Sequence, residues 1–224
     1  MEFKNLHPWD VNYKEAVQIQ QRLQKKLILK KPKSGFRLVA GTDVAYDKKS
    51  DKVFAGVVIL NLENMQRVEQ ATAVGRVRFP YIPGLLSFRE SPILLKAFSK
   101  IKQTPDIIIV DGQGIAHPRG IGLASHLGLI LDMPSVGCAK SRLVGEHEPV
   151  GKKAGSQSYI KINGKVVGVV LRTKTNIKPV YVSPGHKIDL ASVVNVVLKC
   201  CRGYKLPEPT RQAHNLVNKL RRRL

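Results

Sequence analysis

Acidic residues are scarce in this chain. Its 224 residues include 16 Asp and Glu against 38 Lys and Arg, which gives a formal net charge of +22. Such an imbalance predicts a polyanionic partner, because each phosphate that a basic side chain neutralises releases condensed counterions and strengthens binding. We therefore expect the chain to bind nucleic acid.

Long apolar runs, a secretory leader and a cysteine framework are also missing. No stretch approaches the roughly 18 consecutive apolar residues of a membrane-spanning helix. The start, MEFKNLHPWD, is polar and carries charges of both signs, unlike a signal peptide. The three cysteines, Cys138, Cys200 and Cys201, are too few for a disulfide framework and lack the spacing of a zinc site. We expect a cytosolic protein with reduced thiols and no membrane contact.

Glycine-rich nucleotide loops are absent as well. The segment GQGIAHPRG has His117 where a dinucleotide-binding pattern needs its last glycine, and GKKAGSQS lacks the spacing of a phosphate loop. These mismatches exclude a nucleotide-cofactor enzyme of either kind. The 43% hydrophobic content is enough for one substantial core, and no internal repeat or linker divides the chain. We expect a single domain spanning residues 1–224, acting as a monomer.

Hydrophobic periodicity predicts the elements along the chain. An amphipathic helix is expected over residues 13–29, packed on a sheet edge or face. The other elements are expected at 36–46, 52–62 and 67–80 (strands), 84–101 (a helix that Pro92 would kink or break), 107–110 (strand), 120–131 (helix), 134–141 (strand), 158–174 (a hairpin turning at Asn163-Gly164), 179–186 (strand), 189–201 and 209–224 (helices).

The order of these elements favours one fold class. Three antiparallel strands come first and parallel strand–helix–strand units follow, which is typical of an α/β, ribonuclease H-like mixed sheet flanked by helices. A β-hairpin and two C-terminal helices would be appended to it.

Two aspartates fall where such a sheet carries its binding sites. Asp111 ends the buried run IIIVD, at the strand edge where ligands of open α/β sheets bind, although an Asp-Gly pair also commonly starts a turn. Asp43 lies inside the first strand, in AGTDVAY, where a lone carboxylate is costly; the alternative is a solvated residue that opens the hairpin turn. If the two strands are neighbours, the carboxylate pair calls for a cation, and Mg²⁺ suits oxygen ligands.

Other side chains are candidates for the same edge. Glu90, on the helix before the Asp111 strand, would complete the cluster or lie on the surface. Lys140, at the end of the fifth strand, would bind a phosphate or be solvated. His214, on the last helix, would face the site or lie at the boundary of the apolar stripe. His117 is placed to touch a substrate, whereas His126 is expected to be a hydrogen-bonded core residue.

The segment RFPYIPGLL is the second unusual stretch. An aromatic residue and an isoleucine stand between two prolines, in Pro80, Tyr81, Ile82 and Pro83. Proteins insert rigid apolar segments of this kind between bases to separate them and unstack a duplex. A core-facing strand end followed by a proline turn is the other interpretation.

Taken together, these motifs resemble the endonuclease V (deoxyinosine 3′ endonuclease) family. The segments that carry the resemblance span residue 38 to His214 in family order: AGTDVAY, RFPYIPGLLSFRE, VDGQGIAHPRGIGLASHLG, GCAKSRLVG, LRTK, VSPGH and PEPTRQAH. The resemblance implies a ribonuclease H-like DNA repair nuclease. It would recognise hypoxanthine, the base of deoxyinosine, and hydrolyse the second phosphodiester on the 3′ side, leaving 3′-hydroxyl and 5′-phosphate ends.

The resemblance also implies roles for individual residues. Asp43 and Asp111 would bind Mg²⁺, for which Mn²⁺ would substitute, while Glu90 and His214 complete the catalytic cluster and Lys140 contacts the phosphate. The strand-separating wedge would be formed by Pro80, Tyr81, Ile82 and Pro83, and the base pocket by Gly84, Leu86, Gly112 and His117.

Two other functions stay open. A basic nucleic-acid-binding protein without chemistry would use the carboxylates only structurally. An inosine-specific ribonuclease would need contacts to the 2′-hydroxyl, which the sequence does not reveal.

Overall fold

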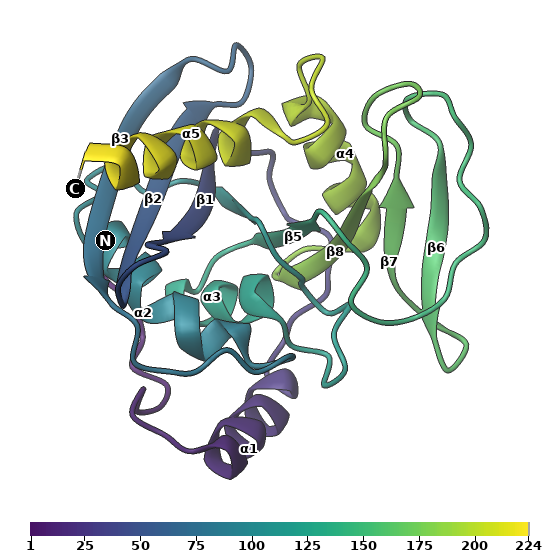
Figure 1. The fold of residues 1–224 in the computed structure, drawn as a ribbon. Coiled ribbons are helices and arrows are strands. Elements are labelled where there is room, and N and C mark those ends of the chain that lie inside the picture. The colour runs from purple at the N-terminus through teal and green to yellow at the C-terminus, as the bar shows by residue number, and fades with distance from the viewer. Residues whose placement is uncertain (224) are drawn as a thin grey trace.

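The structure, a computed structural model, describes residues 1–223; Leu224, the last residue of the helix expected at 209–224, lies outside that part. Its strands are β1 (Leu38–Tyr46), β2 (Lys52–Asn61), β3 (Arg67–Arg76), β4 (Ile107–Val110), β5 (Ser135–Ala139), β6 (Gln157–Ile162), β7 (Lys165–Leu171) and β8 (Val180–His186) (Figure 1). Its helices are α1 (Tyr13–Gln24), α2 (Leu86–Phe98), α3 (Leu123–Leu131), α4 (Leu190–Cys200) and α5 (Glu208–Arg223).

The eight strands form one mixed sheet in the order β3-β2-β1-β4-β5-β8-β7-β6. β1, β2 and β3 are antiparallel neighbours, whereas β4 is parallel to both β1 and β5. The predicted ribonuclease H-like mixed sheet is therefore confirmed. The appended hairpin, β6 and β7, is not a separate unit, since it joins the same sheet through β8, which is antiparallel to β5.

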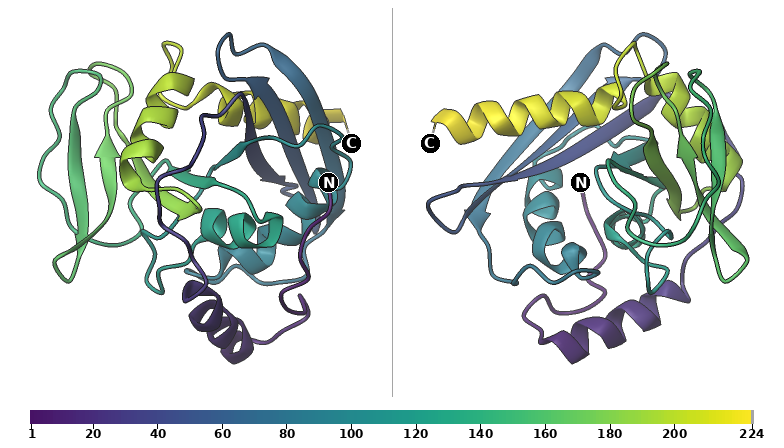
Figure 2. Two further views of the ribbon diagram at one scale, coloured as in Figure 1. Left: turned by 180° about the vertical axis from the view of Figure 1, so that it is seen from behind. Right: turned by 45° about the vertical axis from the view of Figure 1, so that its right-hand side comes forward.

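Helices cover both faces of the central strands, as Figure 2 shows from two sides. Successive side chains of β4 point to opposite faces. Ile108 and Val110 belong to the apolar cluster that includes side chains of α2 and α3. Ile107 and Ile109 belong to the cluster that includes side chains of α4 and α5. All four are fully buried, which is why this strand reads as a continuous apolar run.

The first helix differs from the expectation in length and in place. α1 starts with a capping box between Asn12 and Glu15 but ends at Gln24, because the N–H groups of Lys26 and Leu27 bond three residues back instead of four. It packs outside the layer of α2 and α3, since those helices already cover that face of the sheet. The contact cluster includes Ala16, Ile19, Leu23, Phe88 and Leu129.

Other boundaries shift by a few residues. Pro92 does not break α2, which runs unbroken from Leu86 to Phe98. β3 ends at Arg76, before the prolines, so residues 80–83 form a loop. No helix within residues 1–223 combines the length and the apolar character that a bilayer crossing requires.

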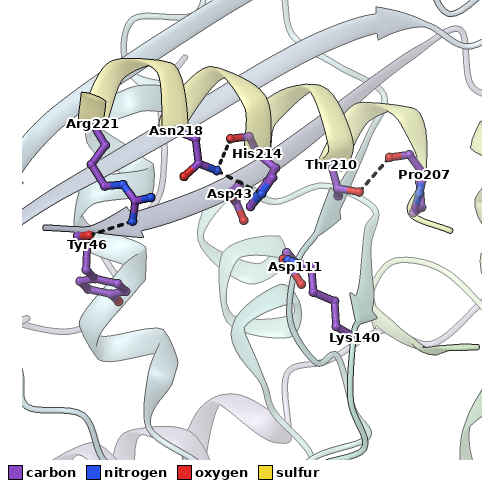
Figure 3. Close-up of polar contacts among 9 residues, drawn as sticks. All are labelled: Asp43, Tyr46, Asp111, Lys140, Pro207, Thr210, His214, Asn218 and Arg221. Atoms are coloured by element: carbon purple, nitrogen blue, oxygen red, sulfur yellow. Dashed lines mark hydrogen bonds and ion pairs between the residues drawn. The ribbon is translucent and has the colours of Figure 1, made fainter. Parts of the chain in front are cut away.

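Two glycines let α5 lie close against the sheet. A Cβ on Gly41 of β1 would be 2.1 Å from the carbonyl carbon of Pro209, and one on Gly56 of β2 would be 2.7 Å from Cγ1 of Val217. The missing side chains allow α5 to cross β1 and β2 closely. This crossing carries His214 to the edge of the sheet where Asp43 lies (Figure 3).

Gly41→Ala should therefore destabilise the protein. The new methyl group would meet backbone atoms, which cannot move aside as a flexible side chain would, so we expect a loss of about 3 kcal/mol in the free energy of unfolding. For a chain of this size that corresponds to a fall in Tm of roughly 6–12 °C, measurable by thermal unfolding. Gly35→Ala is the matched control, because nothing lies within 4 Å of a Cβ at Gly35. Equal Tm values for the two variants would contradict the packing argument.

Candidate active site

Three carboxylates from three elements line one small cavity of about 140 Å³. Asp43 lies on β1, Asp111 directly follows β4, and Glu90 projects from α2. The register pairs Thr42 of β1 with Val110 of β4, so Asp43 and Asp111 come next on two adjacent parallel strands. Asp43 is only 8% exposed, so the interpretation of this residue as a solvated turn opener is wrong.

Burial and mutual repulsion disfavour the charged forms of two of these acids. Burial first, and then the charge of Asp111, raise the pKa of Asp43 to about 6. The pKa of Glu90 is raised to about 8, again chiefly by burial, while a hydrogen bond from Tyr46 opposes the rise. The cavity therefore holds negative charge that its protein surroundings compensate only in part, and a cation would relieve it.

Two basic side chains contact the two aspartates of the cavity (Figure 3). His214 approaches Asp43 with an Nδ1 to Oδ2 distance of 3.0 Å, and its Nε2 lies 3.1 Å from the side-chain nitrogen of Asn218. Because that amide nitrogen can only donate, His214 donates through Nδ1 to Asp43 and accepts at Nε2. The Lys140 ammonium forms an ion pair with Asp111. The structure thus brings together all five residues for which a catalytic role is predicted.

A larger cavity of about 320 Å³ adjoins the acidic one. Leu86, Asp111 and Leu123 contribute to the walls of both. Tyr81 stands at this cavity with 68% of its surface exposed, whereas Phe79 and Leu85 on either side are buried and Ile82 packs against their apolar cluster. Most of the predicted wedge and base-pocket residues line this cavity: Tyr81, Ile82, Pro83, Gly84, Leu86, Gly112 and His117. Pro80 does not line it.

Hydrogen bonds fix the backbone of this cavity at Gly84. Gly84 has a φ of +80°, and its carbonyl oxygen accepts from Gln20 (3.0 Å), His117 (3.0 Å) and Arg119 (2.7 Å). Burial lowers the pKa of His117 to about 4, so the ring is neutral; Nε2 donates to Gly84 and Nδ1 accepts from the Arg119 N–H. Both ring nitrogens of His117 are therefore engaged within the protein, and its direct effect is to hold the pocket wall.

The sequence reasoning missed several residues of the site. Tyr46 donates from its hydroxyl to Glu90 at 2.8 Å, a contact between β1 and α2 that no local pattern indicates. Asn218 had a usable signal, since residues four apart on a helix share a face and His214 is four residues earlier. His126 is the expected core residue: it is fully buried and bonded to His7 and Ser87.

The donor set suits a hard cation held by few protein ligands. Within residues 1–223, no group of three or more His, Cys, Asp or Glu side chains has the arrangement of a complete metal site. Asp43 and Asp111 supply carboxylate oxygens from adjacent strands, and ions such as Mg²⁺ commonly use one or two carboxylates and take their remaining ligands from water and substrate phosphate. The residues present therefore fit a divalent cation of this class.

Comparison with known proteins agrees with the geometry. The sequence profile of the family Endonuclease V matches residues 20–215. Proteins named Endonuclease V from Gloeobacter violaceus and Dehalococcoides mccartyi are 47% and 49% identical, over 97% and 96% of this chain and 89% and 96% of their own lengths.

Solved structures show the same similarity. The crystal structure of Endonuclease V from Streptomyces avermitilis has a TM-score of 0.91 at 40% identity, covering 96% of this chain and 95% of that one. Endonuclease V (D234N) from Ciona intestinalis, in complex with a 23mer DNA containing an inosine followed by a ribo-adenosine, has a TM-score of 0.84 at 25% identity, covering 95% of this chain and 99% of that one. The chain belongs to the endonuclease V family.

Proposed function

We propose that this family member is a divalent-metal-dependent DNA repair endonuclease that recognises hypoxanthine. It hydrolyses the second phosphodiester bond on the 3′ side of the lesion and leaves 3′-hydroxyl and 5′-phosphate ends. One observation carries the proposal: the acidic cavity and the base-sized cavity share Leu86, Asp111 and Leu123 in their walls. A base held in the larger cavity therefore brings its own strand to the carboxylates.

Mg²⁺ is the proposed cofactor, with Mn²⁺ as a substitute, and Asp43 and Asp111 are its proposed ligands. Bound there, the cation would offset the charge that develops on the attacking and leaving oxygens of the phosphate. The raised pKa values of Asp43 and Glu90 support this assignment, because a cation would supply the positive charge that the cavity lacks.

The chain's own side chains supply the remaining functions. Lys140, at the rim beside Asp111, is placed to bind the scissile phosphate and stabilise its developing charge. His214 holds Asp43 in position through Nδ1. Glu90, whose Oε1 accepts from Tyr46, is proposed to take up and release a proton near neutral pH, since its pKa is raised to about 8.

We assign substrate recognition to the larger cavity of about 320 Å³, which we call the base cavity. A deaminated base pairs weakly, so turning it out of the helix costs less than it does for a normal base. α2 begins at Leu86 with no side-chain cap, and the Phe88 N–H of its first turn donates to the Leu85 carbonyl. The N–H groups of Leu86 and Ser87, two residues that line the base cavity, are then the donors left at this helix end. These donors suit the O6 acceptor of hypoxanthine, in contrast to the amino group of adenine. The Ciona intestinalis relative is bound to a DNA in which a ribo-adenosine follows the inosine, and this complex supports inosine-containing DNA as a substrate.

Tyr81→Ala should weaken discrimination for the lesion more than general binding. An exposed aromatic ring at the entrance of the base cavity can fill the gap that a flipped base leaves, and loss of one stacking contact costs about 1–3 kcal/mol. We expect a fall of roughly tenfold in the ratio of affinities for inosine-containing and normal duplexes, measured by titration in EDTA. Equal losses on both duplexes would argue against the wedge.

Mapping of the products tests the proposed function. A duplex with one inosine in an end-labelled strand is incubated with Mg²⁺, and product length is read against synthetic markers. We expect one cut, one nucleotide beyond the inosine on its 3′ side, with ends that a ligase can rejoin. The same strand made as RNA shows which nucleic acid is preferred. Tight binding without a cut in any lane would favour a binding protein without chemistry.

A further inference from the structure

A third cavity, of about 360 Å³, lies beside the start of the wedge and is not used by the proposed mechanism. It is enclosed by the N-terminal segment, the end of β3 and one side of α2, and its volume lies in the range of small-ligand sites, about 300–1,000 Å³. It has no wall residue in common with the base cavity. The base cavity and this third cavity are therefore separate sites.

Helix α2 contributes side chains to the acidic cavity and to the third cavity. Leu86, Glu90 and Leu94, spaced four residues apart, face the acidic cavity, whereas Arg89, Ile93 and Lys96 face the third cavity. At about 100° per residue, the two sets lie on neighbouring faces of α2, roughly 90° apart. The wedge is divided in the same way, because Pro80 lines the third cavity and the following three residues line the base cavity.

The third cavity has the chemistry of a site for an unstacked nucleotide. Trp9 and Phe79 contribute aromatic side chains to its wall. Its charged wall residues are Asp10, Arg76, Arg78, Arg89 and Lys96, four cations against one anion. Arg89 is committed to the fold, since it donates to the Phe79 carbonyl and lies over the Tyr46 ring. The exposed cations at the rim, next to aromatic surface, match the pattern with which proteins hold single-stranded nucleic acid.

We propose that this cavity binds the nucleotide left unpaired in the opposite strand when the wedge separates the duplex. The inference rests on the proposed function, since it requires a wedge that sends the lesion into the base cavity. The opposite strand then lies on the other side of residues 80–83, where the third cavity opens. The base lies against the aromatic wall at Trp9, and Arg78 and Lys96 contact the flanking phosphates.

Cleavage of two substrates by one variant tests this site. The substrates are an inosine-containing single strand and the same strand in a duplex. We expect Arg78→Glu to lower kcat/KM on the duplex about fivefold or more while leaving kcat/KM on the single strand unchanged, because only the duplex has an opposite strand. Lys165→Glu is the matched control: it makes the same charge change in the β6–β7 hairpin, at the far edge of the sheet. It should leave the duplex-to-single-strand ratio unchanged.

The outcomes separate this inference from the proposed function. Wild-type protein that cuts neither inosine substrate would overturn the function itself. Wild-type cleavage, with a duplex-to-single-strand ratio that Arg78→Glu leaves unchanged, would overturn only the opposite-strand site. A ratio that Lys165→Glu lowers as strongly would also overturn it, since general charge would then explain the effect.

Tryptophan fluorescence measures occupation of the third cavity directly. Trp9 is the only tryptophan in the chain, so its emission reports on this wall. In a cleavage-defective Asp111→Asn protein, saturating inosine duplex should quench this emission and saturating inosine single strand should not. Quenching of equal size by both ligands, or by neither, would contradict occupation of the cavity by the opposite strand.

Discussion

Replacing Asp111 by asparagine should lower the cleavage rate by about 10³-fold while leaving affinity for inosine-containing DNA nearly unchanged. The substitution keeps the size of the side chain but removes the charge that pairs with Lys140 and that we propose holds the cation. The base cavity, which retains its shape, should still bind the lesion. Single-turnover cleavage and titration of the same duplex measure the two quantities separately.

Asp106→Asn is the matched control for this variant. Asp106 stands at the opposite end of β4, where its Oδ2 accepts from the N–H groups of Arg37 and Leu38 at 2.7 and 2.8 Å. An asparagine can still accept there, and the site is one strand length away, so cleavage should stay near the wild-type rate. A loss of binding in Asp111→Asn as large as its loss of cleavage would show that Asp111 acts in recognition instead.

Asp43→Asn should abolish activity and, in the absence of metal, stabilise the protein. Burial and the charge of Asp111 raise the pKa of Asp43 from 3.8 to about 6. Below pH 3.8 the acid is protonated in both folded and unfolded chains and costs nothing. As the pH rises through 6, stability is lost, because the unfolded chain releases the proton more readily than the folded one. The cost of the buried charge then reaches about 2–3 kcal/mol.

Thermal unfolding with and without cation tests this account of Asp43. In EDTA at pH 8, Asp43→Asn should unfold at a higher temperature than the wild type, and at pH 4, close to the ordinary pKa of 3.8, the difference should be small. Saturating Mg²⁺ should raise the Tm of the wild type at pH 8 and leave that of the variant nearly unchanged, since the variant lacks one of the two proposed ligands. A wild type that is more stable than the variant in EDTA at pH 8 would contradict the raised pKa.

Local sequence patterns predicted the sheet, because its strands and turns are marked by apolar runs and by turn residues within each segment. β4 is apolar on both faces since both faces are covered, and the Asn163-Gly164 turn fixes the β6–β7 hairpin, with positive φ at both residues. The end of α1 was less predictable, because its apolar residues continue to Leu27 while the chain turns at Lys25. Its place outside α2 and α3 depends on tertiary contacts that no single segment encodes.

The positions of the two aspartates could be predicted from the sequence because the order of the strands could be predicted. Once β1 and β4 are neighbours, Asp43 and Asp111 must meet, because consecutive register positions place them on the same edge. The contact of Tyr46 with Glu90 and the clamp on the Gly84 carbonyl join residues far apart in the chain. Such contacts follow from the packed structure and have no spacing in the sequence that would indicate them.

The most direct test of the account is single-turnover cleavage of two end-labelled duplexes that differ only in one base, inosine or adenosine, each with Mg²⁺ or with EDTA. The account predicts a cut in one of the four reactions, that of the inosine duplex with Mg²⁺. Cleavage of the inosine duplex in EDTA would contradict the role of the carboxylate cavity. Equal cleavage of both duplexes with Mg²⁺ would contradict the role of the base cavity beside it.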